Sequence, residues 1–287
     1  NAIIDMTEYG VPQNRKRIII LGVSKEHYGD KAEAMVEKFY SSYLPEYKIE
    51  KKATVRDAIG DLPKLRPLDE PISYFGRKLS HSVSDPLING HISRFHNKRD
   101  IELFKFLEED IASGRMKYTS AKSLKTLYTK LTGKTSNVHK YYVLRWDEPS
   151  NLIPAHLFKD GLRHIHPDPE QARTITVREA ARLQTFPDDY VFYGSNMDLY
   201  KMIRNAVPPL FAKSCANAVH DIWKDYVDCR RYQKLFFCKN RIIKLAVFVF
   251  ILCRFLLYTS LLSLSMRDKI VNCLQSDCLL SVTICMF

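Results

Sequence analysis

The spacing of hydrophobic positions changes along the chain, and its first clear feature is a continuous apolar run. Residues 18–23 read Ile-Ile-Ile-Leu-Gly-Val and follow a turn-like polar segment. A run of this kind, bounded by Gly, predicts a strand that is buried on both faces, as in a sheet covered by helices. We expect the other strands of that sheet to lie upstream of Asn1.

Helical spacing appears at several places further along. Between residues 100 and 113, apolar residues recur at three- and four-residue steps, which predicts a helix. The Thr-Val-Arg-Glu sequence that begins at Thr176 has the form of a capping box, so a helix should run from there through Leu183 and end before Pro187. Further helices are predicted at residues 32–43, 54–59 and 209–223. Residues 63–100 are predicted to be irregular, and residues 114–172 to be a mixture of polar turns and short apolar runs.

The composition changes sharply after residue 225. Residues 245–265 are almost wholly apolar apart from Arg254, and their length is close to the roughly 20 residues that cross a bilayer. A central Arg costs about 2.5–3.5 kcal/mol in such a segment. The stretch is either a membrane span or the product of out-of-frame translation. Its lack of ordinary flanking residues favours the second, and a membrane-anchored protein is the least favoured interpretation.

The net charge of +12 is unevenly distributed. From Tyr226 onward the chain has nine Lys and Arg and three Asp, which accounts for half of the excess. The preceding residues have 35 basic and 29 acidic side chains and are only mildly basic. Binding to nucleic acid therefore cannot be argued from charge alone.

Cysteine is concentrated in the same final segment. Only Cys215 precedes residue 226, so the rest of the chain has the low cysteine content expected in a reducing cytoplasm, where we place the protein. No Cys-x-x-Cys spacing or histidine cluster accompanies the other cysteines, and we expect no metal site. Cys215 lies on the last predicted helix, where core packing is its expected role.

The first segment with candidate chemistry is residues 9–17, Tyr-Gly-Val-Pro-Gln-Asn-Arg-Lys-Arg. In an extended conformation its alternation places Gln13, Arg15 and Arg17 on one face. Two guanidinium groups on one face suit the recognition of phosphates or base edges. Taken alone, the segment is more simply interpreted as a solvated loop before a strand.

Two later segments complete the pattern. Residues 165–188 contain the capped helix described above, which by itself indicates only an amphipathic helix that packs parts of the protein together. Residues 205–209, Asn-Ala-Val-Pro-Pro, are by themselves a loop with Pro at the start of a helix.

In this order the three segments resemble the eighth, ninth and tenth conserved motifs of DNA cytosine-5 methyltransferases, over about residues 1–225. The sequences at 56–63, 141–149 and 159–161 resemble the bacterial branch. The resemblance implies an α/β fold, with a partial doubly wound domain that uses S-adenosylmethionine and a smaller, irregular target-recognition domain. The expected domains are the end of the catalytic sheet at 1–24, target recognition at 25–160, a return to the catalytic domain at 161–225, and an atypical tail at 226–287.

The resemblance also implies the reaction and its residues. A methyl group would pass from S-adenosylmethionine to C5 of a cytosine in a specific duplex sequence, in a restriction-modification system. The cytosine must be flipped out, because its ring is shielded in the stack. A cysteine thiolate attacks the ring, and a nearby positive charge favours the anionic product of that attack. Arg15 and Arg17 are the expected catalytic residues, Gln13, Arg15, Arg17 and Arg178 the expected DNA contacts, and Asn205, Ala206 and Val207 the expected cofactor contacts.

The sequence departs from the family pattern at several places. It contains no Phe-x-Gly-x-Gly, Pro-Cys or Glu-Asn-Val sequence, so motifs I to VI are absent. Arg204 stands where the family has Gly, which would strain the turn by roughly 1–2 kcal/mol if the backbone angle there were positive. Leu152 stands where the family has Thr and would remove a hydroxyl contact to a DNA phosphate.

Two hypotheses about the whole protein remain open from the sequence. The first is the C-terminal part of a DNA cytosine-5 methyltransferase, inactive alone and active either as part of the full chain or with a separate chain that carries motifs I to VI. The alternative is a catalytically inactive remnant that binds DNA, which predicts salt-sensitive binding without turnover.

Overall fold

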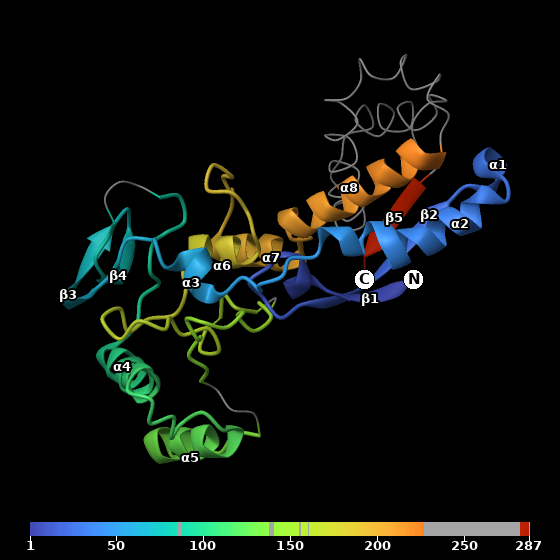
Figure 1. Cartoon of the computed structure of the whole chain (residues 1–287). Helices are drawn as coiled ribbons and strands as arrows, with labels where there is room; N and C mark the ends of the chain where they lie inside the picture. Colours follow the sequence, from blue (N-terminus) through green and yellow to red (C-terminus); the bar gives the residue numbers. More distant parts are fainter. Residues whose placement is uncertain (85–87, 138–140, 155, 160, 227–281, 287) are drawn as a thin grey trace. The chain divides into compact units, whose positions relative to one another are not determined.

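The computed structural model describes residues 1–84, 88–137, 141–154, 156–159, 161–226 and 282–286 (Figure 1). The chain divides into two compact units, which are described separately below. The first unit contains Asn1–Gly10, Lys16–Glu50 and Pro209–Phe287, and the second contains Val11–Arg15 and Lys51–Pro208. The functional domain boundaries expected from the resemblance stay predictions.

The first unit contains a three-stranded sheet in the order β1-β2-β5. Both neighbouring pairs are antiparallel, with Ile3 opposite Ile18 and Ile19 opposite Met286. Among the residues of this unit that the structure describes, three helices and three short helical turns accompany the sheet. The elements are β1 (Ala2–Asp5), η1 (Met6–Tyr9), β2 (Lys16–Val23), α1 (Lys25–Tyr28), α2 (Lys31–Lys38), η2 (Phe39–Tyr43), η3 (Pro45–Tyr47), α8 (Pro209–Tyr226) and β5 (Val282–Met286).

The predicted strand at residues 18–23 exists, but its predicted burial on both faces is wrong for the described structure. Ile19 and Leu21 are 0% and 6% exposed, whereas Ile18 and Ile20 are 42% and 37% exposed. Successive side chains of a strand point to opposite faces of the sheet. Where other elements pack on only one of these faces, a continuous apolar run leaves the apolar side chains of the other face exposed. The phenol of Tyr40 holds this strand by donating to the Ile19 carbonyl and accepting from the Leu21 N–H.

The helices predicted at residues 32–43 and 209–223 are confirmed as α2 with the adjoining η2, and as α8. Phe211 of α8 packs edge-on against Tyr9, with ring centroids 5.1 Å apart. Gly10 has φ +82°, and a Cβ there would lie 2.8 Å from Leu210 Cδ2, so this turn requires glycine. Cys215 is buried in α8, as the predicted packing role requires.

The second unit contains five helices and a two-stranded hairpin among its described residues. The helices predicted at 54–59, 100–113 and 176–183 are confirmed. Residues 63–100 and 114–172 are more regular than predicted, because they contain the hairpin and an additional helix. The elements are α3 (Val55–Ile59), β3 (Pro67–Tyr74), β4 (Arg77–His81), α4 (Lys98–Ala112), α5 (Ala121–Thr132), α6 (Val177–Leu183) and α7 (Asn196–Asn205).

Two apolar clusters hold this unit together. The larger joins α3, α6 and α7 through residues such as Ile59, Ala180 and Ile203. The other joins α4 and α5 to the segment before α6, through residues such as Leu124 and Ile165. The helix α6 is therefore packed from several sides, which fixes its position within the unit.

None of the helices in the described ranges is long and apolar enough to span a membrane. The apolar segment at residues 245–265, for which two interpretations were considered, lies outside the described residues.

Candidate functional site

The segment Val11–Arg15 crosses the second unit as an extended strand-like piece. Its backbone pairs with Ser150, whose carbonyl accepts from the Asn14 N–H at 2.8 Å and whose N–H donates to the Pro12 carbonyl at 3.0 Å. Gln13 and Arg15 are buried, whereas Asn14 is exposed. The alternation agrees with the prediction that Gln13 and Arg15 share one face.

Gln13 and Arg15 meet residues of the ninth and tenth motif segments. The Gln13 amide Nε2 donates to Gln184 Oε1 at 3.0 Å, and Gln184 Nε2 donates to the Ala206 carbonyl at 2.8 Å. The Arg15 Nη2 donates to the same carbonyl at 3.2 Å and to the Arg204 carbonyl at 3.1 Å. We call Gln13, Arg15, Gln184 and Ala206 the junction. It brings three segments together within one unit.

Helix ends place the junction residues. Gln184 is the C-cap of α6, and Ala206 is the C-cap of α7 with an extended backbone at φ −68° and ψ 153°. Arg204 lies in the last turn of α7 and has no positive φ. The condition for strain at this position, a positive backbone angle, is therefore not met, and the helical backbone accommodates Arg204.

The start of α6 is fixed by a buried ion pair between Arg173 and Glu179. Glu179 also accepts the Thr176 N–H at 2.7 Å, and the Thr176 hydroxyl accepts the Glu179 N–H, so the predicted capping box is present. Burial alone would raise the pKa of Glu179, but the charge and hydrogen bonds of Arg173 outweigh it and hold that pKa well below its ordinary value.

Arg178, a predicted DNA contact, is 1% exposed. Its Nε donates to the Asn89 carbonyl at 2.7 Å, its Nη1 to the Pro187 carbonyl at 3.0 Å and its Nη2 to the Tyr190 carbonyl at 2.9 Å. The guanidinium thus holds two loops against α6. Contact between Arg178 and DNA stays a prediction, and these hydrogen bonds favour a structural role.

Arg17 belongs to β2 of the first unit, where its side chain is partly exposed. Its Nη1 donates to the Lys16 carbonyl at 2.7 Å. The approach of Arg15 and Arg17 to a flipped cytosine stays a prediction for both residues.

Four buried polar atoms of residues in or linked to the junction have no hydrogen-bond partner within the described residues. They are Gln13 Oε1, Ser150 Oγ, Asn151 Oδ1 and His164 Nδ1. Ser150 pairs with the Gln13 segment through its backbone, and the Asn151 carbonyl lies 3.4 Å from His164 Nε2. An unsatisfied buried polar group costs about 1–3 kcal/mol, so a water or ligand group would be stabilised at each of these atoms.

Sequence reasoning missed Gln184 and Ser150 as members of this site. Gln184 stands inside the quoted ninth segment, but nothing in its periodicity distinguishes it from other polar residues near a helix end. Ser150 makes its contacts through the backbone, which the type of side chain does not reveal. Both could be found only once the chain had brought Gln13 next to them.

The predicted cofactor contacts lie together at the end of α7, with Asn205 as its last residue and Ala206 and Val207 directly after it. Asn205 is exposed, and Ala206 and Val207 are partly exposed. Among the described residues no group of His, Cys, Asp and Glu could hold a metal ion. Burial raises the pKa of the Cys215 thiol to about 12, which keeps it protonated and poorly nucleophilic.

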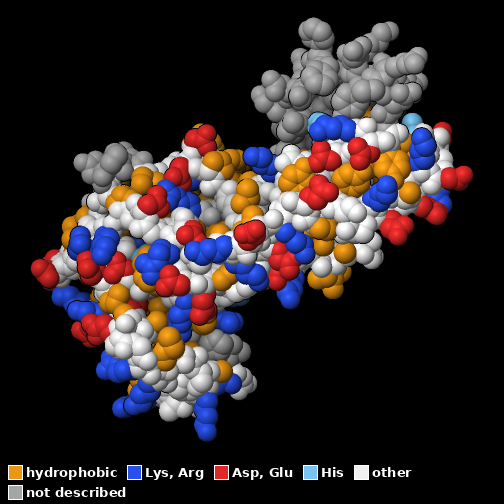
Figure 2. Space-filling model, viewed as in Figure 1, with side chains coloured by type: hydrophobic (Ala, Val, Ile, Leu, Met, Phe, Trp, Pro, Cys, Tyr) orange, Lys and Arg blue, Asp and Glu red, His pale blue; other side chains and the backbone are white. Residues whose placement is uncertain are grey.

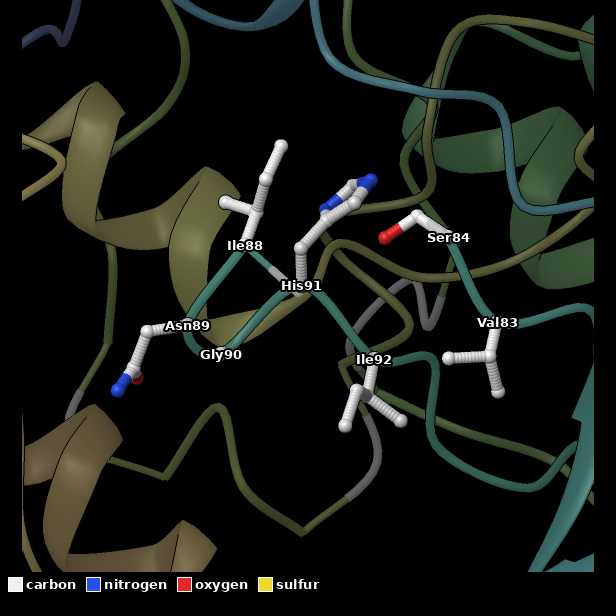
Figure 3. A pocket seen from close by; sticks show the side chains of 7 residues that line it. All are labelled: Val83, Ser84, Ile88, Asn89, Gly90, His91 and Ile92. Atoms are coloured by element: carbon white, nitrogen blue, oxygen red, sulfur yellow. The ribbon is translucent and has the colours of Figure 1, made fainter. Parts of the chain in front are cut away.

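A shallow hollow of about 290 Å³ lies elsewhere in the second unit (Figure 3). Its lining includes Ile88, Asn89, Gly90 and His91, and the Gly90 carbonyl accepts the Arg178 N–H at 3.0 Å. It contains none of the predicted site residues, so the junction and this hollow are separate features.

Comparison with known proteins agrees with the family to which the sequence shows a resemblance. A family model described as C-5 cytosine-specific DNA methylase matches residues 1–221. Curated relatives include the type II methyltransferases M.Bpa9945I of Bacillus paralicheniformis, 34% identical over 77% of this chain, M.AgeI of Thalassovita gelatinovora, 29% over 75%, and M1.HphI of Haemophilus parahaemolyticus, 30% over 76%.

The same matches cover 50%, 64% and 46% of these three relatives, so the chain spans about half of their length. The family match nevertheless extends over most of the chain and includes all three motif segments. The chain therefore belongs to the C-5 cytosine-specific DNA methylase family.

Proposed function

We propose that this chain forms the target-recognition and base-holding part of a DNA cytosine-5 methyltransferase of a type II restriction-modification system. The complete enzyme would transfer a methyl group from S-adenosylmethionine to C5 of a cytosine that is flipped out of a specific duplex sequence. Family membership supports the reaction class, and the names of the relatives support the biological setting. The catalytic cysteine would come from the part of the enzyme that carries motifs I to VI, either in the same polypeptide or on a separate chain.

The junction is the observation that carries this proposal. Gln13, Gln184 and Ala206 come from the eighth, ninth and tenth motif segments, and two hydrogen bonds join them. Gln13 and Gln184 are 171 residues apart in the sequence. Groups that act on one substrate must lie together, and the junction supports such an arrangement for these three segments.

The charged and the neutral residues of the proposed site would have different roles. Arg15 and Arg17 would place positive charge near the cytosine ring and stabilise the anion formed by attack of the cysteine. Gln13 and Arg178 would contribute to the DNA side of the site. Residues 25–160 would form most of the recognition domain, and the flanking segments would complete a doubly wound catalytic domain.

The cofactor would be S-adenosylmethionine, which supplies the methyl group from its sulfonium when bound. The loop at Asn205, Ala206 and Val207 fits one wall of such a site, since it offers an exposed amide and two partly exposed apolar side chains. The Ala206 carbonyl is already engaged by Gln184 and Arg15, so its part is to hold the loop in position.

The test of this proposal takes the part of the enzyme that carries motifs I to VI from a relative. The portion of M.Bpa9945I that this chain does not match is co-expressed with the full chain, and methyl transfer from labelled S-adenosylmethionine to duplex DNA is measured. Bisulfite sequencing then locates the product. We expect C5-methylcytosine with both chains and none with either chain alone. Two folded chains that co-purify and transfer no methyl group would contradict the proposal.

A further inference from the structure

We propose that the exposed face of α5 is a docking surface for the phosphate backbone of duplex DNA. The contacts would come from Lys122, Lys125, Lys130 and Lys134, which we call the lysine face. The inference rests on the proposed function, because that function makes DNA the partner. It adds a second contact region to the DNA surface, distinct from the junction.

The charge of the chain is segregated into this region. Between Asp110 and Asp147 there are eight Lys and Arg and no Asp or Glu. The other residues before Tyr226 have 27 Lys and Arg against 29 Asp and Glu, because the whole of that range has 35 and 29. The net positive charge of residues 1–225 thus comes entirely from the stretch between Asp110 and Asp147. A single polyanion could bind to this stretch.

The geometry of α5 sorts this charge onto one side. Leu124 and Leu127 are buried, and with 3.6 residues per turn Lys122 and Lys125 fall on the side away from them, while Lys130 lies at the edge of that side and is exposed. Lys134 follows the C-cap Gly133. In Figure 2 the tip of the molecule formed by α5 carries Lys and Arg side chains and no Asp or Glu on the face in view.

This face is not a solvated surface of mixed charge. Across the described ranges none of the four lysines makes an ion pair, whereas Lys64 lies 3.1 Å from Asp168 and 3.2 Å from Glu170. The first turn of α5 has no acidic residue, although acidic side chains are favoured there by the helix dipole. Uncompensated cations on one face destabilise a free helix, and a bound polyanion would remove that repulsion.

The helix is held firmly enough to present its charges at a defined place. Leu124 and Leu127 belong to the cluster that contains Ile165 and Ala172, which lie directly before α6. Ile165 is bridged to Val143 and to Thr174. Phosphates bound to the lysine face would therefore lie at a fixed position relative to the ninth motif.

The spacing suits duplex DNA. Lys122 and Lys130 are eight residues apart, a rise of about 12 Å in an α-helix. Duplex DNA presents about seven phosphates over that length of its axis. Flexible lysine ammonium groups can reach such phosphates without a fixed geometry, so the face should strengthen binding to every sequence equally.

The experiment neutralises the lysine face in the full chain and compares it with a control of equal charge. The test variant is K122Q/K125Q/K130Q/K134Q, and the control is K25Q/K31Q/K48Q/K224Q in the first unit. Circular dichroism and urea denaturation establish that both fold. Affinity for a fluorescent duplex is measured by anisotropy from 50 to 400 mM KCl, with a double-stranded RNA of equal length as a parallel arm.

We expect the slope of log affinity against log salt to fall by about three to four in the test variant, with about tenfold or greater loss of affinity at low salt. The control should keep the slope of the unmodified chain. Equal slopes in all three proteins, equal losses in both variants, or a lysine-dependent preference for RNA would each overturn the inference. The proposed function is tested separately by the two-chain assay. If it fails and this inference holds, methyl transfer is absent but the lysine-dependent binding to DNA is still measured.

Discussion

Arg173 and Glu179 form a fully buried ion pair with two parallel hydrogen bonds. Arg173 Nη1 lies 2.7 Å from Glu179 Oε2, and Nη2 lies 2.6 Å from Oε1. Neither side chain is exposed. Because Glu179 also caps the first turn of α6, the helix of the ninth motif depends on a charge whose partner comes from the segment just before it.

The substitution Glu179→Gln should remove about 3–5 kcal/mol from the free energy of unfolding, because it leaves the Arg173 charge buried without a counter-ion. Urea denaturation followed by circular dichroism measures the loss. The control is Asp188→Asn, which breaks the bond between Arg182 and Asp188, a carboxylate whose side chain is 50% exposed. That change should cost less than about 1 kcal/mol. Similar losses in the two variants would contradict the argument.

Stability should also fall as the pH drops from about 6.5 towards 4. Burial lowers the pKa of His81 and His164 to about 4 and of His96 and His166 to about 3. The unfolded chain has ordinary histidines of pKa near 6.5, so in this window it binds more protons than the folded state. Each such histidine contributes a slope of up to about 1.4 kcal/mol per pH unit. Glu108 opposes them, because burial raises its pKa and the folded state binds the additional proton.

The measurement is the free energy of unfolding from pH 7.5 to 4.5. We expect it to decrease on acidification, with His166→Gln reducing the slope by about one proton and Glu108→Gln increasing it. A free energy that stays constant between pH 6.5 and 5 would contradict the assignment of these histidines as neutral.

The β3–β4 hairpin has a turn that its residues do not favour. Phe75 and Gly76 have φ of +46° and +73°, and Phe75 is 88% exposed. Two residues with positive φ define the turn that prefers Asn-Gly, so Phe75→Asn should relieve backbone strain while losing the edge contact with Tyr74. Phe75→Ala loses the same contact without the relief. The Asn variant should be more stable than the Ala variant by about 1 kcal/mol, measured by thermal unfolding, and equal midpoints would show that the turn is unstrained.

The hairpin and α5 show two different limits of prediction from the sequence. The hairpin was missed because β3 contains Pro67 and Pro71 and its turn lacks the usual Asn-Gly signal. The signals for α5 were present, since Ser120 caps its start, Gly133 its end, and leucines recur between them. They were outweighed by the many polar residues of the segment, and packing of Leu124 and Leu127 against α4 decides the structure.

The elements with complete local signals were predicted well. The capping box at Thr176 and the apolar steps of α4 specify helices through contacts within a few residues, so no distant partner is needed. Burial could not be predicted in the same way. The run at 18–23 specifies a strand, but which faces are covered depends on elements that lie far away in the sequence.

The contacts of the candidate site could not be predicted from local sequence patterns. The bond between Gln13 and Gln184 spans 171 residues, and no periodicity links them. Only the resemblance to a family placed their segments together. Even so, it did not indicate that Arg15 would donate to backbone carbonyls or that Arg178 would be enclosed by three of them.

Arg17 offers a direct test of the proposed chemistry, because its neighbour supplies a matched control. Arg17→Gln should lower methyl transfer in the two-chain assay by about 10- to 100-fold, since a charged hydrogen bond to the substrate is worth roughly 1.5–3 kcal/mol. Stability should change little, as the side chain is partly exposed. Lys16→Gln removes the same charge from the adjacent, exposed position and should retain activity. Equal activities of the two variants would argue against a role for Arg17 in catalysis.

The junction itself can be tested with a double-mutant cycle on Gln13 and Gln184. Each single change to Leu should cost about 1–3 kcal/mol of stability, because it leaves a buried amide of the other residue unpaired. The double variant removes both amides, so it should cost less than the sum of the singles, with a coupling energy of about 1 kcal/mol. In the two-chain assay Gln184→Leu should reduce methyl transfer more than Gln13→Leu, because Gln184, unlike Gln13, also donates to the Ala206 carbonyl. Additive stability losses, with equal effects on activity, would show that the two glutamines act independently and that the three motif segments are held together by other contacts.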